Sequence, residues 1–252
     1  MNEYASGFIL GLVQGLTEFL PVSSSGHLVL LEKMGVGEES LTMNLLLHLA
    51  TLLAVIVCYR KKIFSLLKHP LGEEMRFLLV ASVPTAVFAG AIRYFLPDTS
   101  DFLPFFFMVT TVVLLLPKIV KPKEREIVCK PYGKAIFVGV MQGVACFNGV
   151  SRSGSTVTAM RLCGYSAEKS AETSFLLSVP IIIASAVVEC LTNKSGLKFS
   201  GGAILGMVTA FVVGIGAIKL FVSVLKKDKT AYFSIYTFAL SVLSFFLLFP
   251  KK

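Results

Sequence analysis

Six stretches of this sequence are apolar and long enough to cross a hydrocarbon core of about 30 Å as helices of roughly 20 residues. They lie near residues 41–58, 75–95, 102–117, 168–190, 200–222 and 230–249. Charged residues make up only 15% of the chain, whereas soluble domains contain about 25%. Because the bilayer core leaves unpaired backbone groups without water, a chain crosses it as helices or a closed barrel. We therefore expect an all-α polytopic membrane protein, with one transmembrane domain over residues 1–252.

The net charge of +9 is gathered in short clusters between the apolar runs, which is typical of cytoplasmic loops and does not indicate nucleic-acid binding. One side of the predicted membrane carries thirteen basic residues: Arg60, Lys61, Lys62, Lys68, Lys118, Lys121, Lys123, Arg125, Lys130, Lys134, Lys226, Lys227 and Lys229. The other side carries six: Lys33, Arg93, Lys194, Lys198, Lys251 and Lys252. The first side is therefore predicted to face the cytoplasm.

Two further apolar segments are too short to cross the membrane. Residues 7–20 would form only about 21 Å of helix, and Pro21 then interrupts them. Residues 134–147 end in the same way before Asn148 and Gly149. A backbone break at membrane depth is tolerated where it is buried in protein or lines a wet cavity. We expect two re-entrant broken hairpins, the first from outside and the second from the cytoplasm.

The sequence repeats itself at an offset of 128 positions. Residues 13–26 align with residues 141–154 without a gap, with identical Gln, Gly, Phe, Val, Ser, Ser and Gly. We therefore expect two pseudo-repeats, 1–117 and 134–249, joined by a basic cytoplasmic loop, 118–133. Each would contain one broken hairpin and three spans. Since three is odd, the second half would be inverted, as in transporters whose site lies between the repeats.

The two breaks differ in their ionisable residues. The first has Glu18 and His27 where the second has cysteine and serine, and the second has Arg152 where the first has Ser24. An ionisable group at membrane depth costs about 2.5–3.5 kcal/mol or more, so it indicates function. The structural alternative is that Glu18 only neutralises Arg152.

Arg152 predicts an anion site, because its planar guanidinium can hold two phosphate oxygens at once. It lies where a helix is expected to restart, so backbone N–H groups should face the same anion. Ser151, Ser153 and Thr156 add hydroxyl groups nearby. Ser23 in the first break is a further candidate to bind phosphate, and all three serines can also act as helix caps.

Gln14 and Glu18 lie four residues apart on one predicted helical face. Such a face can hold a divalent cation, Mg²⁺ or Ca²⁺, together with substrate phosphates. His27 follows Ser24 by three residues, so it can act as a general acid or base or activate that serine. The alternative is that His27 is a hydrogen-bonded packing residue.

His48 and Glu172 lie inside predicted spans, and Glu172 aligns with Asn44 at the repeat offset. They are candidates to line the cavity and to contact the site residues rather than the substrate. A purely structural role is an equal alternative for each.

These residues resemble the bacterial undecaprenyl-diphosphate phosphatases of the bacitracin-resistance type. That family has (E/Q)xxxE, then FLPVSSxGH, and later PGxSRSxxT. This chain has Gln14-x-x-x-Glu18, then FLPVSSSGH at 19–27, and GVSRSGST at 149–156. The resemblance covers nearly the whole chain. It departs at Asn148, where the family has proline, and at Asn44, where an acidic residue is common.

The resemblance implies hydrolysis of a C55 polyprenyl diphosphate to the monophosphate and inorganic phosphate, with a divalent cation. This reaction recycles the lipid carrier of cell-wall synthesis at the outer face of the bacterial plasma membrane and confers resistance to bacitracin. The resemblance implies these roles: phosphate binding by Ser151, Arg152, Ser153 and Thr156, work with the metal or attacking group by Gln14 and Glu18, and nucleophile and partner by Ser24 and His27.

Three questions stay open at this point. The nucleophile can be Ser24, His27 or water. A lipid-phosphate or anion carrier (flippase) would also use an inverted repeat and Arg152, but it would need no nucleophile. The glycines at 201, 202, 214 and 216 can pack helices within one subunit or form a homodimer.

Overall fold

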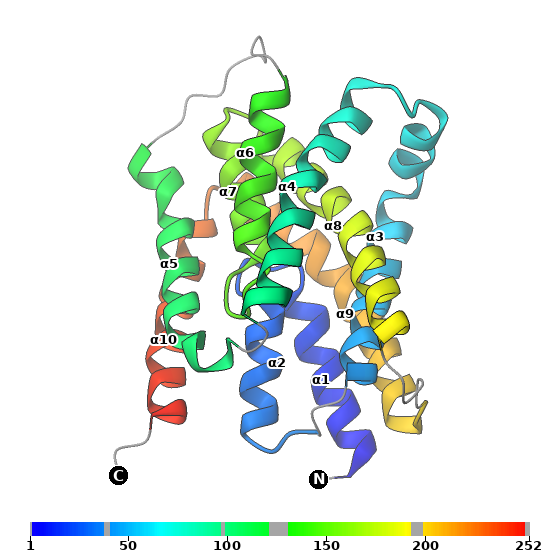
Figure 1. Cartoon of the computed structure of the whole chain (residues 1–252). Helices are drawn as coiled ribbons and strands as arrows, with labels where there is room; N and C mark the ends of the chain where they lie inside the picture. The colour runs from blue at the N-terminus through cyan, green and yellow to red at the C-terminus, as the bar shows by residue number, and fades with distance from the viewer. Residues whose placement is uncertain (1, 38–40, 97–98, 121–130, 193–198, 250–252) are drawn as a thin grey trace.

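The protein, in its computed structural model, is described over residues 2–37, 41–96, 99–120, 131–192 and 199–249 (Figure 1). In these ranges it has ten α-helices, two short 3₁₀ turns and no strand, which confirms the all-α prediction. The helices are α1 (Glu3–Thr17), α2 (Ser24–Lys33), α3 (Leu41–Lys68), α4 (Glu73–Phe95), α5 (Leu103–Val120), α6 (Pro131–Val144), α7 (Arg152–Leu162), α8 (Ala167–Thr192), α9 (Gly201–Lys226) and α10 (Phe233–Leu248).

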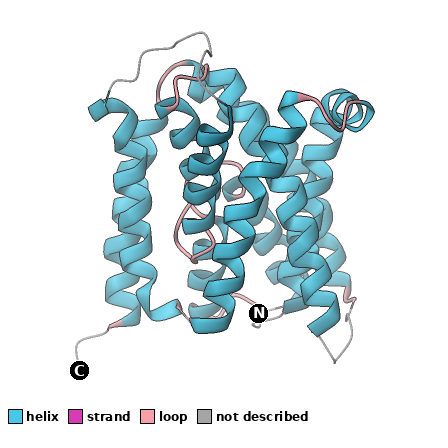
Figure 2. Ribbon diagram, turned by 45° about the horizontal axis from the view of Figure 1, so that its top comes forward, coloured by secondary structure: helices cyan, strands magenta, loops and turns pink. Residues whose placement is uncertain are grey.

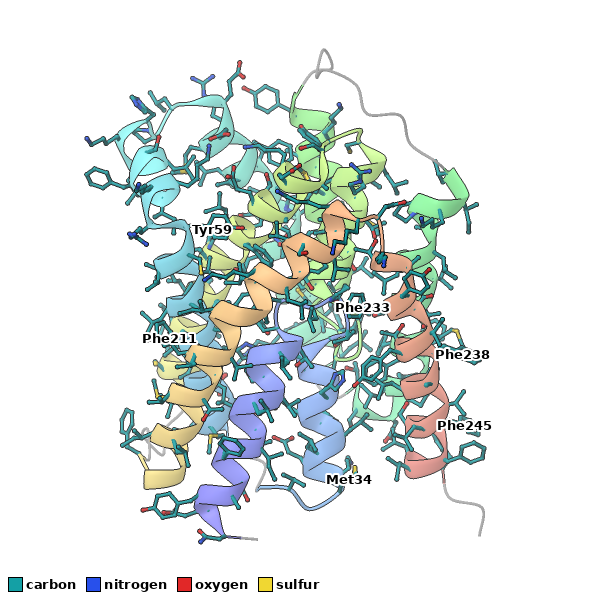
Figure 3. The ribbon with its side chains drawn as sticks, turned by 180° about the vertical axis from the view of Figure 1, so that it is seen from behind. Met34, Tyr59, Phe211, Phe233, Phe238 and Phe245 are labelled. Carbon is teal, nitrogen blue, oxygen red and sulfur yellow. The ribbon has the colours of Figure 1, made fainter. Side chains whose placement is uncertain are left out.

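Six segments of the described chain are long and apolar enough to cross a membrane, as predicted. They are Thr42–Lys68, Glu73–Phe95, Ser100–Val120, Ala167–Leu191, Gly201–Lys226 and Thr230–Leu248. Many large apolar side chains on them are exposed, and Figure 3 shows Phe238 and Phe245 projecting from α10 away from the bundle. Such surfaces suit lipid tails, so the chain is a multi-pass membrane protein.

Two predicted boundaries are wrong. α3 does not end near residue 58 but runs to Lys68, because the basic residues that follow are good helix formers. The helix bends at Tyr59, whose φ of −108° and ψ of 19° are not helical. The loop predicted at 118–133 is shorter at both ends, since α5 continues to Val120 and α6 begins at Pro131. Residues 121–130 of that loop lie outside the described residues.

Four helices are too short to cross the membrane alone. α1, α2, α6 and α7 have 15, 10, 14 and 11 residues, which corresponds to about 15–23 Å of helix each. In Figure 1, α1 and α2 occupy the lower half of the molecule and α6 and α7 the upper half. Figure 2 shows loops lying inside the helical bundle as well as at its ends.

Both short apolar helices end three residues earlier than predicted. α1 ends at Thr17, because Pro21 has no N–H and disfavours helical backbone in the residue before it. α6 ends at Val144, and the following turn reaches Gly149, whose φ of 101° suits glycine. The two turns are therefore set by the residues that interrupt the apolar pattern.

Glycines bring the short helices against long ones. α1 packs along α9, where a Cβ added to Gly11 would lie 2.3 Å from the carbonyl oxygen of Gly206. α6 packs along α4, where a Cβ on Gly139 would lie 2.1 Å from the carbonyl oxygen of Ala81. Gly11 and Gly139 occupy the same position of the sequence repeat. In both halves, therefore, this glycine allows the short helix to approach the backbone of a long helix closely.

Most of the glycines considered for a dimer pack within the chain. Cβ atoms on Gly201, Gly202 and Gly214 would lie within 3 Å of Tyr4, Glu3 and Phe19, respectively. Only Gly216 of these four has open space around it. These residues therefore hold α9 against α1 and the first break.

Candidate active site

The turn between α1 and α2 and the turn between α6 and α7 are hydrogen-bonded to each other. The Gly149 N–H donates to the Ser23 hydroxyl oxygen at 3.1 Å, and the Ser153 hydroxyl donates to the Leu20 carbonyl at 3.0 Å. These residues are separated by more than 120 positions in the chain. The two breaks therefore form one structural unit.

Ser23 has an unusual backbone conformation in the first break. Its φ of 69° and ψ of 95° lie in a region that non-glycine residues rarely adopt, at a cost of about 1–3 kcal/mol. Its hydroxyl accepts hydrogen bonds from Gly149 and from the Gly26 N–H at 3.3 Å. The conformation is thus held both by the cap of α2 and by the opposite break.

A side chain from α5 holds the second break. The Thr110 hydroxyl donates to the Gly149 carbonyl at 2.8 Å and accepts from the Ser151 N–H at 2.9 Å. Ser151 in turn caps α7, since its hydroxyl accepts from the Gly154 N–H at 3.1 Å. Nothing in the sequence distinguishes Thr110 from any other threonine in an apolar helix.

Glu18 is the centre of the buried polar cluster, with only 6% of its surface exposed. One carboxylate oxygen pairs with the Arg152 guanidinium. The other accepts from the Ser24 hydroxyl at 2.5 Å and from the Gln14 amide at 3.1 Å. The Nδ1 atom of His48 lies 3.6 Å from the same oxygen. Four predicted residues and one candidate supporting residue thus meet at this carboxylate.

Two polar atoms of this cluster are buried and have no hydrogen-bond partner within the described residues. They are the amide oxygen of Gln14, which is an acceptor, and the Nη1 atom of Arg152, which is a donor. An unsatisfied buried polar group costs about 1–3 kcal/mol. A bound ligand with both an anionic oxygen and a cation or hydroxyl would satisfy them.

His27 does not meet Ser24 as the sequence spacing suggested. Its Nδ1 lies 2.7 Å from the Ser23 carbonyl and its Nε2 lies 2.8 Å from the Tyr236 hydroxyl. The carbonyl can only accept, so Nδ1 carries the proton and Tyr236 donates to Nε2. The imidazole and the Tyr236 ring are stacked, with centroids 5.7 Å apart. Both ring nitrogens are therefore used, while the Ser24 hydroxyl is directed to Glu18.

The hydroxyls predicted to bind phosphate have partners in the protein. Ser153 bonds the first break, and Thr156 donates to the Arg152 carbonyl at 2.9 Å and lies 2.5 Å from the Ser174 hydroxyl. With Ser151 as a cap, all three stabilise the start of α7 around Arg152. Their phosphate-binding role stays a prediction.

Glu172 lies in a different cluster. Its carboxylate is 3.1 Å from Lys169 and 3.7 Å from Lys62, and both lysines also pair with Glu74. This network joins α3, α4 and α8. The structure therefore brings His48 to the Glu18 carboxylate and Glu172 to the lysines.

The comparisons with known proteins give the family. The family model for the bacitracin resistance protein BacA matches residues 7–243. The chain belongs to the BacA family. An undecaprenyl-diphosphatase of Carboxydothermus hydrogenoformans is 37% identical, over 96% of both chains. One of Borrelia recurrentis is 36% identical, over 98% of this chain and all of the relative. Undecaprenyl-diphosphatase 3 of Bacillus cereus is 32% identical, over 99% of both chains.

The match to the BacA family includes both breaks and every residue of the Glu18 cluster. The departure at Asn148 does not prevent the second turn, which closes through a hydrogen bond of 3.1 Å from the Val150 N–H to the Phe147 carbonyl. Asn44 donates to the Glu32 carboxylate at 3.3 Å. Neither asparagine removes a group from around Glu18.

Proposed function

We propose that this protein is a membrane enzyme that hydrolyses undecaprenyl diphosphate to undecaprenyl phosphate and inorganic phosphate. The observation that carries the proposal is the buried Glu18–Arg152 pair with Ser24 against the same carboxylate. The family and the printed names of the relatives give the substrate. This reaction recycles a lipid carrier of cell-wall synthesis, and resistance to bacitracin agrees with the name of the family.

Arg152 is the group that binds the diphosphate. Its free Nη1 is a donor, and the restarting helix α7 adds N–H groups and a positive dipole end. A substrate phosphate then competes with Glu18 for the guanidinium. Once Arg152 turns to the phosphate, the Glu18 carboxylate becomes free to accept a proton.

Ser24 is the proposed nucleophile. Its proton acceptor is Glu18, not His27, which the sequence spacing had suggested for that role. The Ser24 oxygen attacks the terminal phosphorus while its proton passes to Glu18, at 2.5 Å. The bond from that phosphorus to the bridging oxygen breaks, and undecaprenyl phosphate leaves. Water then attacks the phosphorus of the phosphoserine and the bond from phosphorus to the serine oxygen breaks. Glu18 returns its proton to that oxygen, and inorganic phosphate leaves with the protons of the water.

Arg152 stabilises the charge that develops on the transferred phosphoryl group in both steps. His27 lies on the other side of Ser23, and its hydrogen bond to that carbonyl at 2.7 Å supports the break. In this scheme His27 is a positioning residue. Direct attack by water is the alternative, and it would leave no phosphoserine.

A divalent cation, Mg²⁺ or Ca²⁺, fits this cluster only together with the substrate. The protein offers the Glu18 carboxylate and the unpartnered amide oxygen of Gln14, and Mg²⁺ commonly binds one or two carboxylates plus substrate phosphates. When bound, such a cation would neutralise phosphate charge. The protein groups named above bind the phosphate, hold the serine and move its proton.

The two halves also support an inverted repeat with re-entrant hairpins. A Cβ on Gly26 would lie 3.0 Å from Gly149, and a Cβ on Gly154 would lie 3.2 Å from Pro21. Both partners of these two contacts exchange under the repeat offset, as expected of a two-fold relation between the halves. With the basic loops in the cytoplasm of a bacterial cell, α1 and α2 would lie on the outer side of the plasma membrane, and the site would open there.

Labelling tests that orientation. In right-side-out cells that express a variant with its five native cysteines replaced, Lys33→Cys should react with a membrane-impermeant maleimide, and Lys227→Cys should react only after permeabilisation. The reverse pattern would mean that the site opens to the cytoplasm.

Phosphate release tests the enzyme proposal. Purified protein in detergent should release phosphate from undecaprenyl diphosphate in the presence of Mg²⁺ or Ca²⁺, and a chelator should stop it. No release by folded protein with either cation would leave the carrier alternative, which needs Arg152 but no nucleophile. A cross-linking series at Gly216 would test the homodimer.

A further inference from the structure

A groove on the surface of the bundle lies between α3 and α9, outside the Glu18 cluster. It has a volume of about 560 Å³. One wall is formed by Val57, Cys58, Tyr59 and Arg60 of α3, and the other by Ile215, Ile218, Lys219 and Val222 of α9. Figure 3 shows Tyr59 beside the upper part of α9. The bend of α3 at Tyr59 shapes this wall, since the backbone there leaves the helical conformation.

The groove has two cationic side chains and apolar walls. Ile215, Lys219 and Val222 are spaced by four and three residues, so they share one face of α9. Lys219 lies seven residues before Lys226, the end of α9, or about 10 Å along the helix. A lysine within an apolar span is costly unless its ammonium group finds an anion or water.

Arg60 and Lys219 have no carboxylate partner within the described residues, whereas four lysines at this end of the molecule do. Lys62 and Lys169 pair with Glu74, Lys118 pairs with Asp228, and Lys226 pairs with Glu168. Within the part of the chain that the structure describes, Arg60 donates to the Val57 carbonyl, at 3.0 Å, and to no carboxylate. A groove with two such cations and apolar walls is complementary to an anion that also has an apolar part.

We propose that this groove binds one anionic bilayer phospholipid, such as phosphatidylglycerol. The phosphate lies between Arg60 and Lys219, and an acyl chain packs along Val57, Ile215 and Val222. A guanidinium and an ammonium group match a phosphodiester in charge, and the apolar walls match a lipid chain but not a free phosphate ion.

The groove is separate from the active site. His48, the residue of α3 that meets the Glu18 cluster, lies twelve residues before Arg60, or about 18 Å along the helix. None of the residues that line the groove belongs to the groups assigned to phosphoryl transfer. Their substitution therefore tests lipid binding apart from catalysis.

Native mass spectrometry of the purified protein, titrated with phosphatidylglycerol or phosphatidylcholine, measures the proposed site. The wild type should retain one phosphatidylglycerol in preference to phosphatidylcholine. The variant Arg60→Gln/Lys219→Gln should bind phosphatidylglycerol roughly 10–30-fold more weakly, since each basic group near a membrane surface contributes about 1 kcal/mol. Phosphate release serves as the control for folding and should stay near the wild-type rate.

The matched control is Lys61→Gln/Lys227→Gln, which removes the same charge from exposed positions outside the groove. It should bind the lipid as the wild type does. Equal loss in both double variants would show diffuse electrostatic binding and overturn the site. Unchanged binding in Arg60→Gln/Lys219→Gln would overturn it as well, as would displacement of the lipid by millimolar inorganic phosphate.

The thiol of Cys58, which lines the groove, gives an independent measurement. Phosphatidylglycerol should slow alkylation of Cys58 relative to Cys190, which is exposed on α8, when both peptides are followed by mass spectrometry. Phosphatidylcholine should have a much smaller effect. Equal protection by the two lipids would contradict a site that recognises the anionic headgroup.

Discussion

Glu18, directly after α1, and Arg152, the first residue of α7, form a buried ion pair across the two halves of the chain. They are 134 positions apart in the sequence. Glu18 lies at the start of the first break, and Arg152 lies at the end of the second. Removing one partner of a buried pair leaves an uncompensated charge, which costs about 3–5 kcal/mol. The pair therefore links the fold of the two breaks to the proposed chemistry.

Glu18→Gln should lower phosphate release by about 10²–10⁴-fold, because the variant loses the proton acceptor for Ser24. The amide keeps the shape of the side chain but leaves Arg152 without its carboxylate, so turnover is compared per mole of folded protein, measured by gel filtration in detergent. Glu3→Gln, an exposed position in the first turn of α1, is the matched control and should keep wild-type turnover. Full activity of Glu18→Gln would exclude Glu18 as the base.

Ser24→Ala should remove nearly all turnover, while Ser25→Ala should remove little, because only Ser24 is bonded to Glu18. Rapid acid quenching followed by peptide mass spectrometry should detect phosphate on Ser24 of the wild type. If the phosphate is found on His27, or if Ser24→Ala turns over normally, Ser24 is not the nucleophile.

Tyr236→Phe should lower kcat by roughly 5–30-fold, because a hydrogen bond to buried His27 is worth about 1–2 kcal/mol. The ring remains, so the stacking and the fold should be kept. Tyr232→Phe, an exposed residue just before α10, serves as the control. Wild-type kcat in Tyr236→Phe would mean that the position of His27 does not depend on this hydroxyl.

Thr110→Val should destabilise the second break, since it leaves a buried carbonyl and a buried N–H without the hydroxyl that joins them. We expect a loss of about 2 kcal/mol or more, measured as a lower unfolding temperature in detergent. Thr209→Val, at a half-buried site of α9 away from the breaks, should unfold near the wild-type temperature. An unchanged Tm for Thr110→Val would contradict the proposed clamp.

Gly139→Ala should reduce the yield of folded protein, because the added methyl group would meet the Ala81 carbonyl at 2.1 Å. Overpacking of this kind costs about 1–3 kcal/mol. Gly90→Ala in α4 has open space around it and should be tolerated. Equal yields of the two variants would show that α6 and α4 can separate without cost.

The sequence predicted the spans well, because they depend on a local pattern. Apolar length sets a membrane-spanning helix. The ionisable residues in which the two aligned breaks differ indicated Glu18 and Arg152 as site residues, and their pairing was raised only as the structural alternative. Helix ends were less predictable, since charged residues after Tyr59 continue α3 instead of ending it.

Contacts between distant elements could not be read from spacing. Thr110 and Tyr236 reach the breaks from α5 and α10, and nothing in their neighbouring residues distinguishes them. The spacing of Ser24 and His27 suggested a pair, but the cap of α2 directs the imidazole to Ser23 and the hydroxyl to Glu18. Glu172 pairs with Lys62 and Lys169 and does not reach the Glu18 cluster.

The most direct test of the account is kcat/KM for release of phosphate from undecaprenyl diphosphate by Arg152→Lys, compared with Arg161→Lys on the same helix. Lysine keeps the charge but lacks the planar guanidinium, whose several N–H donors can bind Glu18 and a phosphate at the same time. We predict that Arg152→Lys loses at least about 10²-fold in kcat/KM, while Arg161→Lys, whose side chain bonds the Tyr165 carbonyl, stays within a few-fold of the wild type. Wild-type kcat/KM in a folded Arg152→Lys protein would contradict a shared active site at the two breaks.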